Sequence, residues 1–118
     1  LFTTTDTTFK LALTPKHKPS NPQKMKDLWS TLGLSFPYLY DETQQVAKNF
    51  KAECTPEFYL FNSNQKLVYR GRMDETSPGS NNEPSGKDLR KAINNLQENK
   101  PISEDQFPSM GCNIKWKT

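Results

Sequence analysis

Two short apolar runs on either side of a polar tetrapeptide constrain this chain more than any other feature. Phe58 to Phe61 reads FYLF, Leu67 to Tyr69 reads LVY, and Asn62-Ser63-Asn64-Gln65 lies between them. Aromatic and β-branched runs that flank a few turn-forming residues predict a β-hairpin. One antiparallel pair of strands is therefore expected near the middle of the chain.

The other apolar clusters predict further strands and helices. A weakly alternating segment, residues 9–13, and the segment LSFPYLY, residues 34–40, each predict a strand. Pro37 confines the second of these strands to a sheet edge or an irregular start. The cleanest helix signal begins at Ser20, Asn21 or Pro22 and carries apolar residues at helical spacing. These residues are Met25, Leu28, Trp29 and Leu32.

Two more helices follow this pattern. Asp41 or Thr43 opens a short helix that contains Val46, Ala47 and Phe50. The last helix carries Leu89, Ala92, Ile93 and Leu96 at helical spacing, and Ser85 with Asp88 resembles a capping box at its start. Between the hairpin and this helix, residues 74–84 are rich in Ser, Asn, Pro and Gly and predict a long loop.

The predicted order is strand, helix, strand, helix, hairpin, helix and tail. This order indicates an α/β sheet with one antiparallel pair. Residues 1–8 contain five threonines without periodicity and predict a frayed or disordered start. Residues 9–99 then form the domain, and residues 100–118, which contain Pro101 and Pro108, form an extended tail.

Composition excludes several classes of protein. Hydrophobic residues make up 32% of the chain and the net charge is only +3, so the chain has a thin core but is not a strongly charged disordered one. The sequence shows neither a membrane span nor a signal-peptide pattern. A single histidine, His17, and the lack of a paired Cys motif argue against zinc. The basic cluster Lys16, Lys18, Lys24 and Lys26 lacks interleaved aromatic residues, so nucleic-acid binding is not expected.

The segment from Phe36 to Met73 resembles the thioredoxin-like redoxins of the alkyl hydroperoxide reductase/thiol-specific antioxidant group. Phe36-Pro37-Tyr38-Leu39-Tyr40-Asp41 is similar to the strand before a helix of that fold. Cys54-Thr55-Pro56, followed by EFYLF, is similar to its cis-proline loop and the next strand, and KLVYRG to the second hairpin strand. The tail PSMGCNIKW, residues 108–116, is similar to the ending of one redoxin subgroup.

The resemblance implies a thioredoxin-like fold of which this chain is the C-terminal portion. Redoxins of this kind carry a reactive cysteine, usually in a C-x-x-C pair, between an earlier strand and helix, and this sequence has no such unit. In the family fold that strand lies between the strand at residues 9–13 and the one at Phe58–Phe61. We therefore expect an incomplete, marginally stable domain with an exposed sheet edge.

The two cysteines are the candidate thiols. Cys54 lies on the loop that, in the family, faces the reactive cysteine, and it is either an exchange partner or a buried small hydrophobe. Cys112 lies near Lys115 and Lys117, and positive neighbours favour a thiolate. It is either a resolving cysteine or an ordinary tail cysteine. A Cys54–Cys112 disulfide is not fixed by the spacing, because bridging requires Cα atoms about 4.4–6.8 Å apart.

The resemblance also implies that Thr55-Pro56 shapes a substrate groove. A cis bond there would turn the preceding backbone outward, where it could pair with an extended substrate. The carboxylates Asp41, Glu42, Glu53 and Glu57, and the cations Arg70 and Arg72, are expected to be solvated surface charges. Trp29 is expected in the core and Trp116 to anchor the tail.

Two candidate functions follow from the resemblance. The first is a segment of a thiol-disulfide oxidoreductase or peroxiredoxin-like antioxidant protein, whose whole form would use a peroxide or protein disulfide and a thiol reductant, with no cofactor. The second is a non-catalytic thioredoxin-like module that binds partners at the Thr55-Pro56 groove. Reduced cysteines and the absence of a signal favour an intracellular, cytoplasmic site, whereas the oligomeric state is left open.

Overall fold

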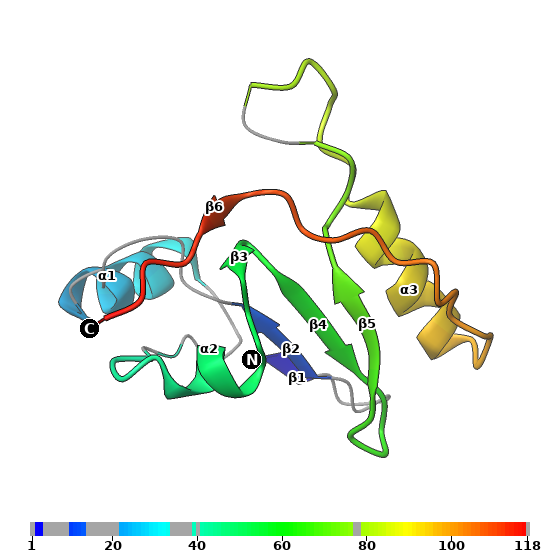
Figure 1. Cartoon of the computed structure of the whole chain (residues 1–118), viewed down its shortest axis with the longest axis horizontal. Coiled ribbons are helices and arrows are strands. Elements are labelled where there is room, and N and C mark those ends of the chain that lie inside the picture. The colour runs from blue at the N-terminus through cyan, green and yellow to red at the C-terminus, as the bar shows by residue number, and fades with distance from the viewer. Residues whose placement is uncertain are drawn as a thin grey trace.

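A computed structural model gives the fold, and it describes residues 2–3, 10–13, 22–33, 39, 41–76 and 79–117. The strands are β1 (Phe2–Thr3), β2 (Lys10–Leu13), β3 (Cys54–Thr55), β4 (Phe58–Phe61), β5 (Leu67–Gly71) and β6 (Cys112–Asn113). The helices are α1 (Pro22–Leu32), α2 (Gln45–Asn49) and α3 (Lys87–Gln97). Figure 1 shows their arrangement.

Most predicted elements are present at the expected places. The strand at residues 9–13, the three helices and the hairpin are confirmed as β2, α1, α2, α3 and the β4–β5 pair. The predicted strand at residues 34–40 lies almost wholly outside the described residues, as does the predicted frayed start apart from β1. Residues 98–111 contain no helix or strand, and the short strand β6 lies within the predicted tail.

The main sheet has the strand order β1-β2-β4-β5, and each neighbouring pair is antiparallel. Leu60 on β4 pairs with Leu11 on one side and Tyr69 on the other. We expected only one antiparallel pair, and this was wrong, because the main sheet of the described residues has three. The strand that the resemblance implies between β2 and β4 has no counterpart here, since these two strands pair directly. An unpaired strand edge leaves backbone N–H and C=O groups unsatisfied, and β2 removes that cost by pairing directly with β4.

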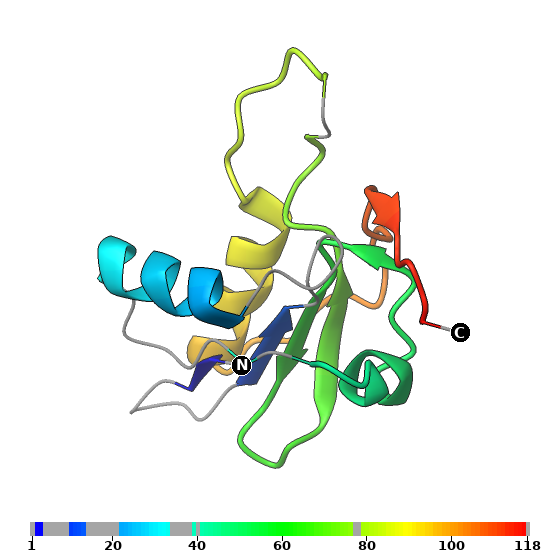
Figure 2. The same cartoon turned by 90° about the vertical axis from the view of Figure 1, so that its left-hand side faces the viewer.

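Strand β4 divides the core into two small clusters because its side chains alternate between the two faces of the sheet. Phe58 and Leu60 pack with Tyr69 and with Leu89 and Ala92 of α3. Tyr59 points the other way and packs with Ala47 of α2 and Ala52, and Phe50, Phe61 and Ile114 surround this second cluster. Figure 2 shows α1 and α3 on one side of the sheet and α2 on the other.

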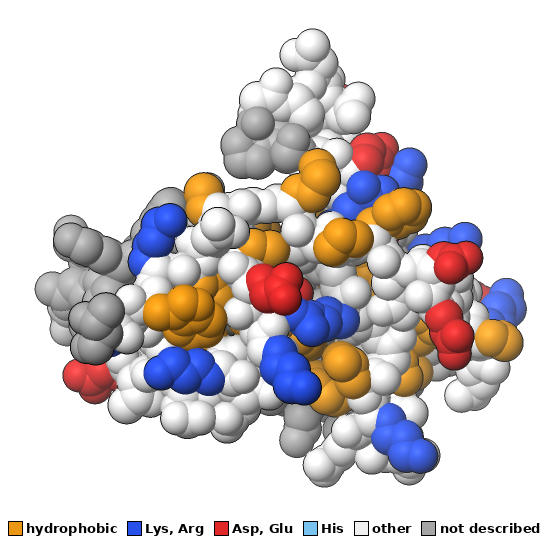
Figure 3. Space-filling view, in the orientation of Figure 1, with side chains coloured by type: hydrophobic (Ala, Val, Ile, Leu, Met, Phe, Trp, Pro, Cys, Tyr) orange, Lys and Arg blue, Asp and Glu red, His pale blue; other side chains and the backbone are white. Residues whose placement is uncertain are grey.

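Apolar side chains are scattered over one face of the molecule. Figure 3 shows the hydrophobic side chains of one face interspersed with Lys, Arg, Asp and Glu. Among the exposed ones are Met73, Phe107, Met110 and Trp116. Trp116 is 43% exposed, with the Lys48 ammonium 6.0 Å from its ring centre, so it rests on α2 at the surface. The side chain of Trp29 lies outside the described residues.

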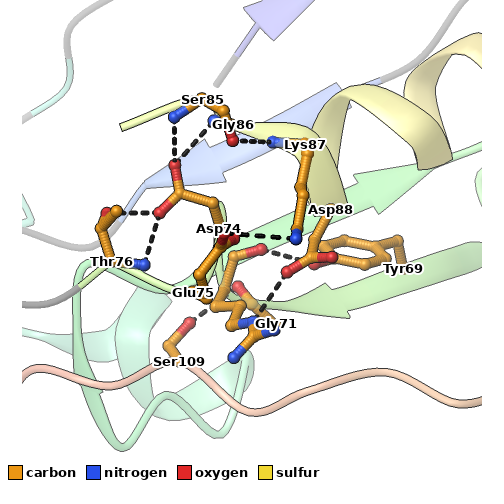
Figure 4. A network of polar contacts seen from close by, with 11 residues as sticks. Tyr69, Gly71, Asp74, Glu75, Thr76, Ser85, Gly86, Lys87, Asp88 and Ser109 are labelled. Carbon is orange, nitrogen blue, oxygen red and sulfur yellow. Dashed lines mark hydrogen bonds and ion pairs between the residues drawn. The ribbon is translucent and has the colours of Figure 1, made fainter. Parts of the chain in front are cut away.

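A buried carboxylate, Asp74, sets the start of α3 (Figure 4). Its oxygens accept hydrogen bonds from the backbone N–H groups of Ser85 (2.9 Å), Gly86 (2.6 Å) and Thr76 (2.8 Å), and from the Thr76 hydroxyl. The predicted capping box is wrong, because Asp88 binds Arg72 at 2.7 Å instead of reaching back. Asp74 thus joins the two ends of the loop between β5 and α3.

Candidate functional site

The segment Cys54-Thr55-Pro56 forms a short strand followed by a cis peptide bond. The cis bond joins Thr55 to Pro56, as the resemblance implied. Thr55 is 1% exposed and Cys54 is buried, whereas Pro56 is exposed. The loop therefore presents the Pro56 ring and the edge of β3, while the side chains of Cys54 and Thr55 are both buried.

The C-terminal tail pairs with this edge. Strand β6 runs antiparallel to β3, with Thr55 opposite Cys112 and Cys54 opposite Asn113. The Ile114 N–H extends the ribbon by donating to the Glu53 carbonyl at 3.2 Å. The structure thus brings together all four predicted site residues, Cys54, Thr55, Pro56 and Cys112.

Two glycines allow the tail to approach the body of the protein closely. A Cβ at Gly111 would overlap the Thr55 carbonyl oxygen and lie 2.8 Å from its carbon. A Cβ at Gly71 would overlap the carbonyl oxygen of Phe107 in the same way. Distances this short do not occur for real Cβ atoms, so both positions require glycine for the tail to lie where it does.

The Cys54 thiol lies beneath the tail. Its Sγ is 3.4 Å from the Ser109 carbonyl oxygen, to which it donates. Burial raises the pKa of the Cys54 thiol, the negative charges of Glu57 and Glu53 raise it further, and Arg70 partly opposes them. A raised pKa reduces the thiolate fraction, so this environment is that of a structural cysteine rather than a nucleophile.

Cys112 has a different environment. It is exposed, and neither cysteine is in a disulfide. Residues directly opposite one another in an antiparallel pair share a face, and neighbours along a strand alternate. Since Cys112 is opposite Thr55, the side chains of Cys112 and Cys54 point to opposite faces of the ribbon. The register therefore argues against a Cys54–Cys112 disulfide.

An ion pair between Glu57 and Arg70 lies directly after the cis-proline loop, and its carboxylate is buried. Glu57 is 5% exposed, and its carboxylate accepts from Arg70 Nε at 2.9 Å and from the Glu53 N–H at 3.0 Å. The Arg70 guanidinium also donates to the Lys51 carbonyl at 2.6 Å and lies 5.4 Å from the Tyr59 ring centre. The prediction of solvated charges was wrong for these two residues.

The same correction applies to Arg72. It pairs with Asp88, is 19% exposed, and its guanidinium lies 4.2 Å from the Phe107 ring centre. Glu57, Arg70 and Arg72 all lie in or beside the hairpin strands, where the backbone fixes their positions. The sequence contains a signal for the burial of Glu57. This residue is two positions before the buried Tyr59 on a strand and therefore lies on the same face of the sheet.

Burial also shifts the titration of two tyrosines. It raises the pKa of Tyr59, with a further contribution from the Glu57 charge. Burial, followed by the charge of Asp88, raises the pKa of Tyr69 to about 12, while Arg72 opposes this. The Tyr69 hydroxyl donates to the Arg72 carbonyl. Both phenols are therefore neutral at physiological pH.

Within the described ranges, no three His, Cys, Asp or Glu side chains are grouped so that they could hold a metal ion. His17 lies outside those ranges. None of the described helices has the length and apolarity needed to cross a membrane.

Comparison with known proteins gives one family and similar solved structures, among them the two described next. The redoxin family model matches residues 10–89. A crystal structure of an uncharacterized conserved protein from Geobacillus kaustophilus is 48% identical, with a TM-score of 0.77, over 82% of this chain and 51% of its own. A hypothetical protein from Sinorhizobium meliloti is 39% identical, with a TM-score of 0.78, over 83% of this chain and 54% of its own.

The chain thus spans about half the length of these two solved structures. No curated protein matches it.

Proposed function

Because the chain belongs to the redoxin family and has a thioredoxin-like α/β fold, we propose that it is the C-terminal part of a peroxiredoxin-like thiol oxidoreductase. Neither of its two cysteines is in a C-x-x-C pair. The proposal therefore assigns the attacking cysteine to a segment outside these 118 residues. This chain contributes the cis-proline loop and a second thiol.

Cys112 is the second thiol in this scheme. In the peroxide reaction, the attacking thiolate breaks the O–O bond, becomes a sulfenic acid, and releases water or an alcohol. The Cys112 thiol then condenses with the sulfenic acid to give a disulfide and a second water. An external dithiol reduces that disulfide and is itself oxidised.

The observation that carries the proposal is the contrast between the two thiols at one loop. Cys112 is exposed and opposite Thr55, whereas Cys54 is buried with a raised pKa. An accessible thiol next to the cis-proline loop is suited to exchange, and a buried one is suited to packing. Cys54 is therefore assigned a structural role, in which its side chain packs beneath the tail.

Thiol titration with an aromatic disulfide reagent tests this assignment. We expect one fast and one slow thiol in the native chain, loss of the fast phase in Cys112→Ser, and its retention in Cys54→Ser. A fast phase that disappears with Cys54→Ser instead would refute the assignment. In peroxide and insulin-reduction assays the chain alone should show no robust turnover; such turnover would contradict an attacking cysteine outside the chain.

A second candidate function is partner binding without catalysis. It is supported by the β3 edge, which pairs with an extended segment in this structure. A double variant, Cys54→Ser with Cys112→Ser, separates the two functions. Retained partner binding by that variant would favour the binding module, and its loss would favour thiol exchange.

A further inference from the structure

The C-terminal tail crosses the molecule, and we call its residues 106–117 the strap. Figure 1 shows the tail leaving α3 and passing the ends of β5 and β3, and Figure 2 shows its C-terminal end on the side of the sheet that carries α2. At one end, Gln106 bonds to the backbone of Val68 and Arg70 on β5. At the other end, the Gln44 side chain donates to the Lys115 carbonyl (2.9 Å) and accepts from the Lys117 N–H (2.7 Å).

Between these two anchors the tail is held mainly through backbone groups. Arg72 N–H donates to the Phe107 carbonyl at 3.1 Å, and the Ser109 hydroxyl donates to the Gly71 carbonyl at 2.7 Å. The side chains here contribute little burial: Phe107 is 56% and Met110 53% exposed. Segments with few buried apolar contacts open at low free energy. Residues 107–113 can therefore lift without unfolding either core cluster, while Ile114 keeps its packing against the second cluster.

The strap pairs with the edge that the second candidate function assigns to a partner. An extended polypeptide added to a sheet edge uses the backbone N–H and C=O groups of that edge. The edge of β3 faces residues 111–114 of the tail. Two chains cannot occupy this edge together.

We propose that residues 107–113 act as a built-in competitor, which must leave the β3 edge before an extended polypeptide can pair there. This inference rests on the second candidate function, in which the β3 edge beside Thr55-Pro56 receives a polypeptide. The same movement uncovers Cys54, whose Sγ lies against the Ser109 carbonyl. The occupant that fits the edge best in this structure is the tail sequence itself, with glycine where the backbones approach most closely.

The test compares two glycine substitutions, both made in a Cys112→Ser background. Gly111→Ala introduces the overlap with Thr55 and should displace the strap. Gly79→Ala is the matched control, because no described atom lies within 4 Å of a Cβ there, although its φ of +85° carries some strain. The readouts are the alkylation rate of Cys54 by iodoacetamide and the binding of a labelled peptide of residues 108–117 that carries Cys112→Ser.

We expect Gly111→Ala to raise both the Cys54 alkylation rate and the affinity for the peptide by about tenfold or more, which corresponds to a shift of about 1.4 kcal/mol in strap opening. Gly79→Ala should change neither by more than about twofold. Circular dichroism checks that each variant is folded. If Gly111→Ala is unfolded, Gln44→Asn replaces it, since Asn tolerates the φ of 61° at this position but is too short for both bonds to the tail.

Two results would overturn the inference. One is a folded Gly111→Ala or Gln44→Asn variant in which iodoacetamide alkylates Cys54 as slowly as in the Gly79→Ala control. The other is a variant in which Cys54 becomes reactive but the peptide still does not bind. Cys54 alkylation reports whether the tail has left the β3 edge even when no peptide binds, so a tail that does not open is distinguishable from an edge that does not bind a polypeptide.

Discussion

Substituting the two members of the buried Glu57–Arg70 pair should destabilise the protein unequally. Arg70→Met leaves the Glu57 carboxylate, with a side chain only 7% exposed, without its counter-charge. Glu57→Gln leaves a guanidinium that is 33% exposed and still donates to the Lys51 carbonyl. Water reaches the abandoned cation but hardly reaches the abandoned anion, so the arginine substitution should cost more.

The expected magnitudes follow from this difference in exposure. Removing one partner of a fully buried pair costs about 3–5 kcal/mol of unfolding free energy. We expect about 3 kcal/mol for Arg70→Met, at the lower end because Glu57 keeps the Glu53 N–H. For Glu57→Gln we expect about 1–2 kcal/mol, discounted because solvent screens the exposed guanidinium.

Urea unfolding followed by circular dichroism measures these losses. The double variant should lose less than the sum of the single variants by about 1 kcal/mol or more, since the two residues are in contact. The control is Glu98→Gln, which breaks an exposed pair with Lys100 and should cost less than about 0.5 kcal/mol. Equal losses for Glu57→Gln and Arg70→Met, or losses as small as in the control, would refute the reasoning.

Three further outcomes are expected. Hydrogen bonds from Thr76 and from the backbone hold the pKa of Asp74 well below its usual range. Its stabilisation should therefore be complete above about pH 4 and fall in more acidic solution; urea midpoints across that range should depend less on pH in Asp74→Asn, and an unchanged dependence would contradict this. The raised pKa of Tyr69, about 12, means that the neutral phenol stabilises the fold below about pH 10 and that this contribution is lost as the pH rises toward 12; Tyr69→Phe should remove that alkaline loss in the same assay. Leu60→Ala should cost about 2–5 kcal/mol because Leu60 is fully buried, whereas Leu67→Ala, at a position 48% exposed, should cost less than about 1 kcal/mol; similar losses in thermal unfolding would argue against the described core.

Local patterns in the sequence were sufficient for most of the elements, and the resemblance was sufficient for the cis-proline loop. Alternation in FYLF and LVY predicts the hairpin, and the resemblance places the cis-proline loop directly before it, where the structure has it. The tail cysteine was also singled out. These features depend on neighbouring residues or on a short motif, so one sequence is enough to find them.

The errors concern contacts between distant residues. The pairing of β2 with β4 joins residues more than forty positions apart, and no local pattern selects it over another partner. Glu57 and Arg70 were assigned to solvent because charged residues usually are exposed, and only the sheet register reveals that they meet. Asp88 was assigned to a cap, but the nearby Arg72 forms a stronger, charge-assisted bond with it.

The β3–β6 ribbon also has a consequence for synthesis of the protein. Cys54 and Ser109, which meet in the fold, are 55 positions apart in the chain. A ribosome therefore makes the cis-proline loop, both hairpin strands and α3 before it makes the segment that covers β3. During that interval the nascent chain displays an uncovered strand edge, the kind of surface on which intermolecular pairing begins. Arrival of the tail ends this exposure.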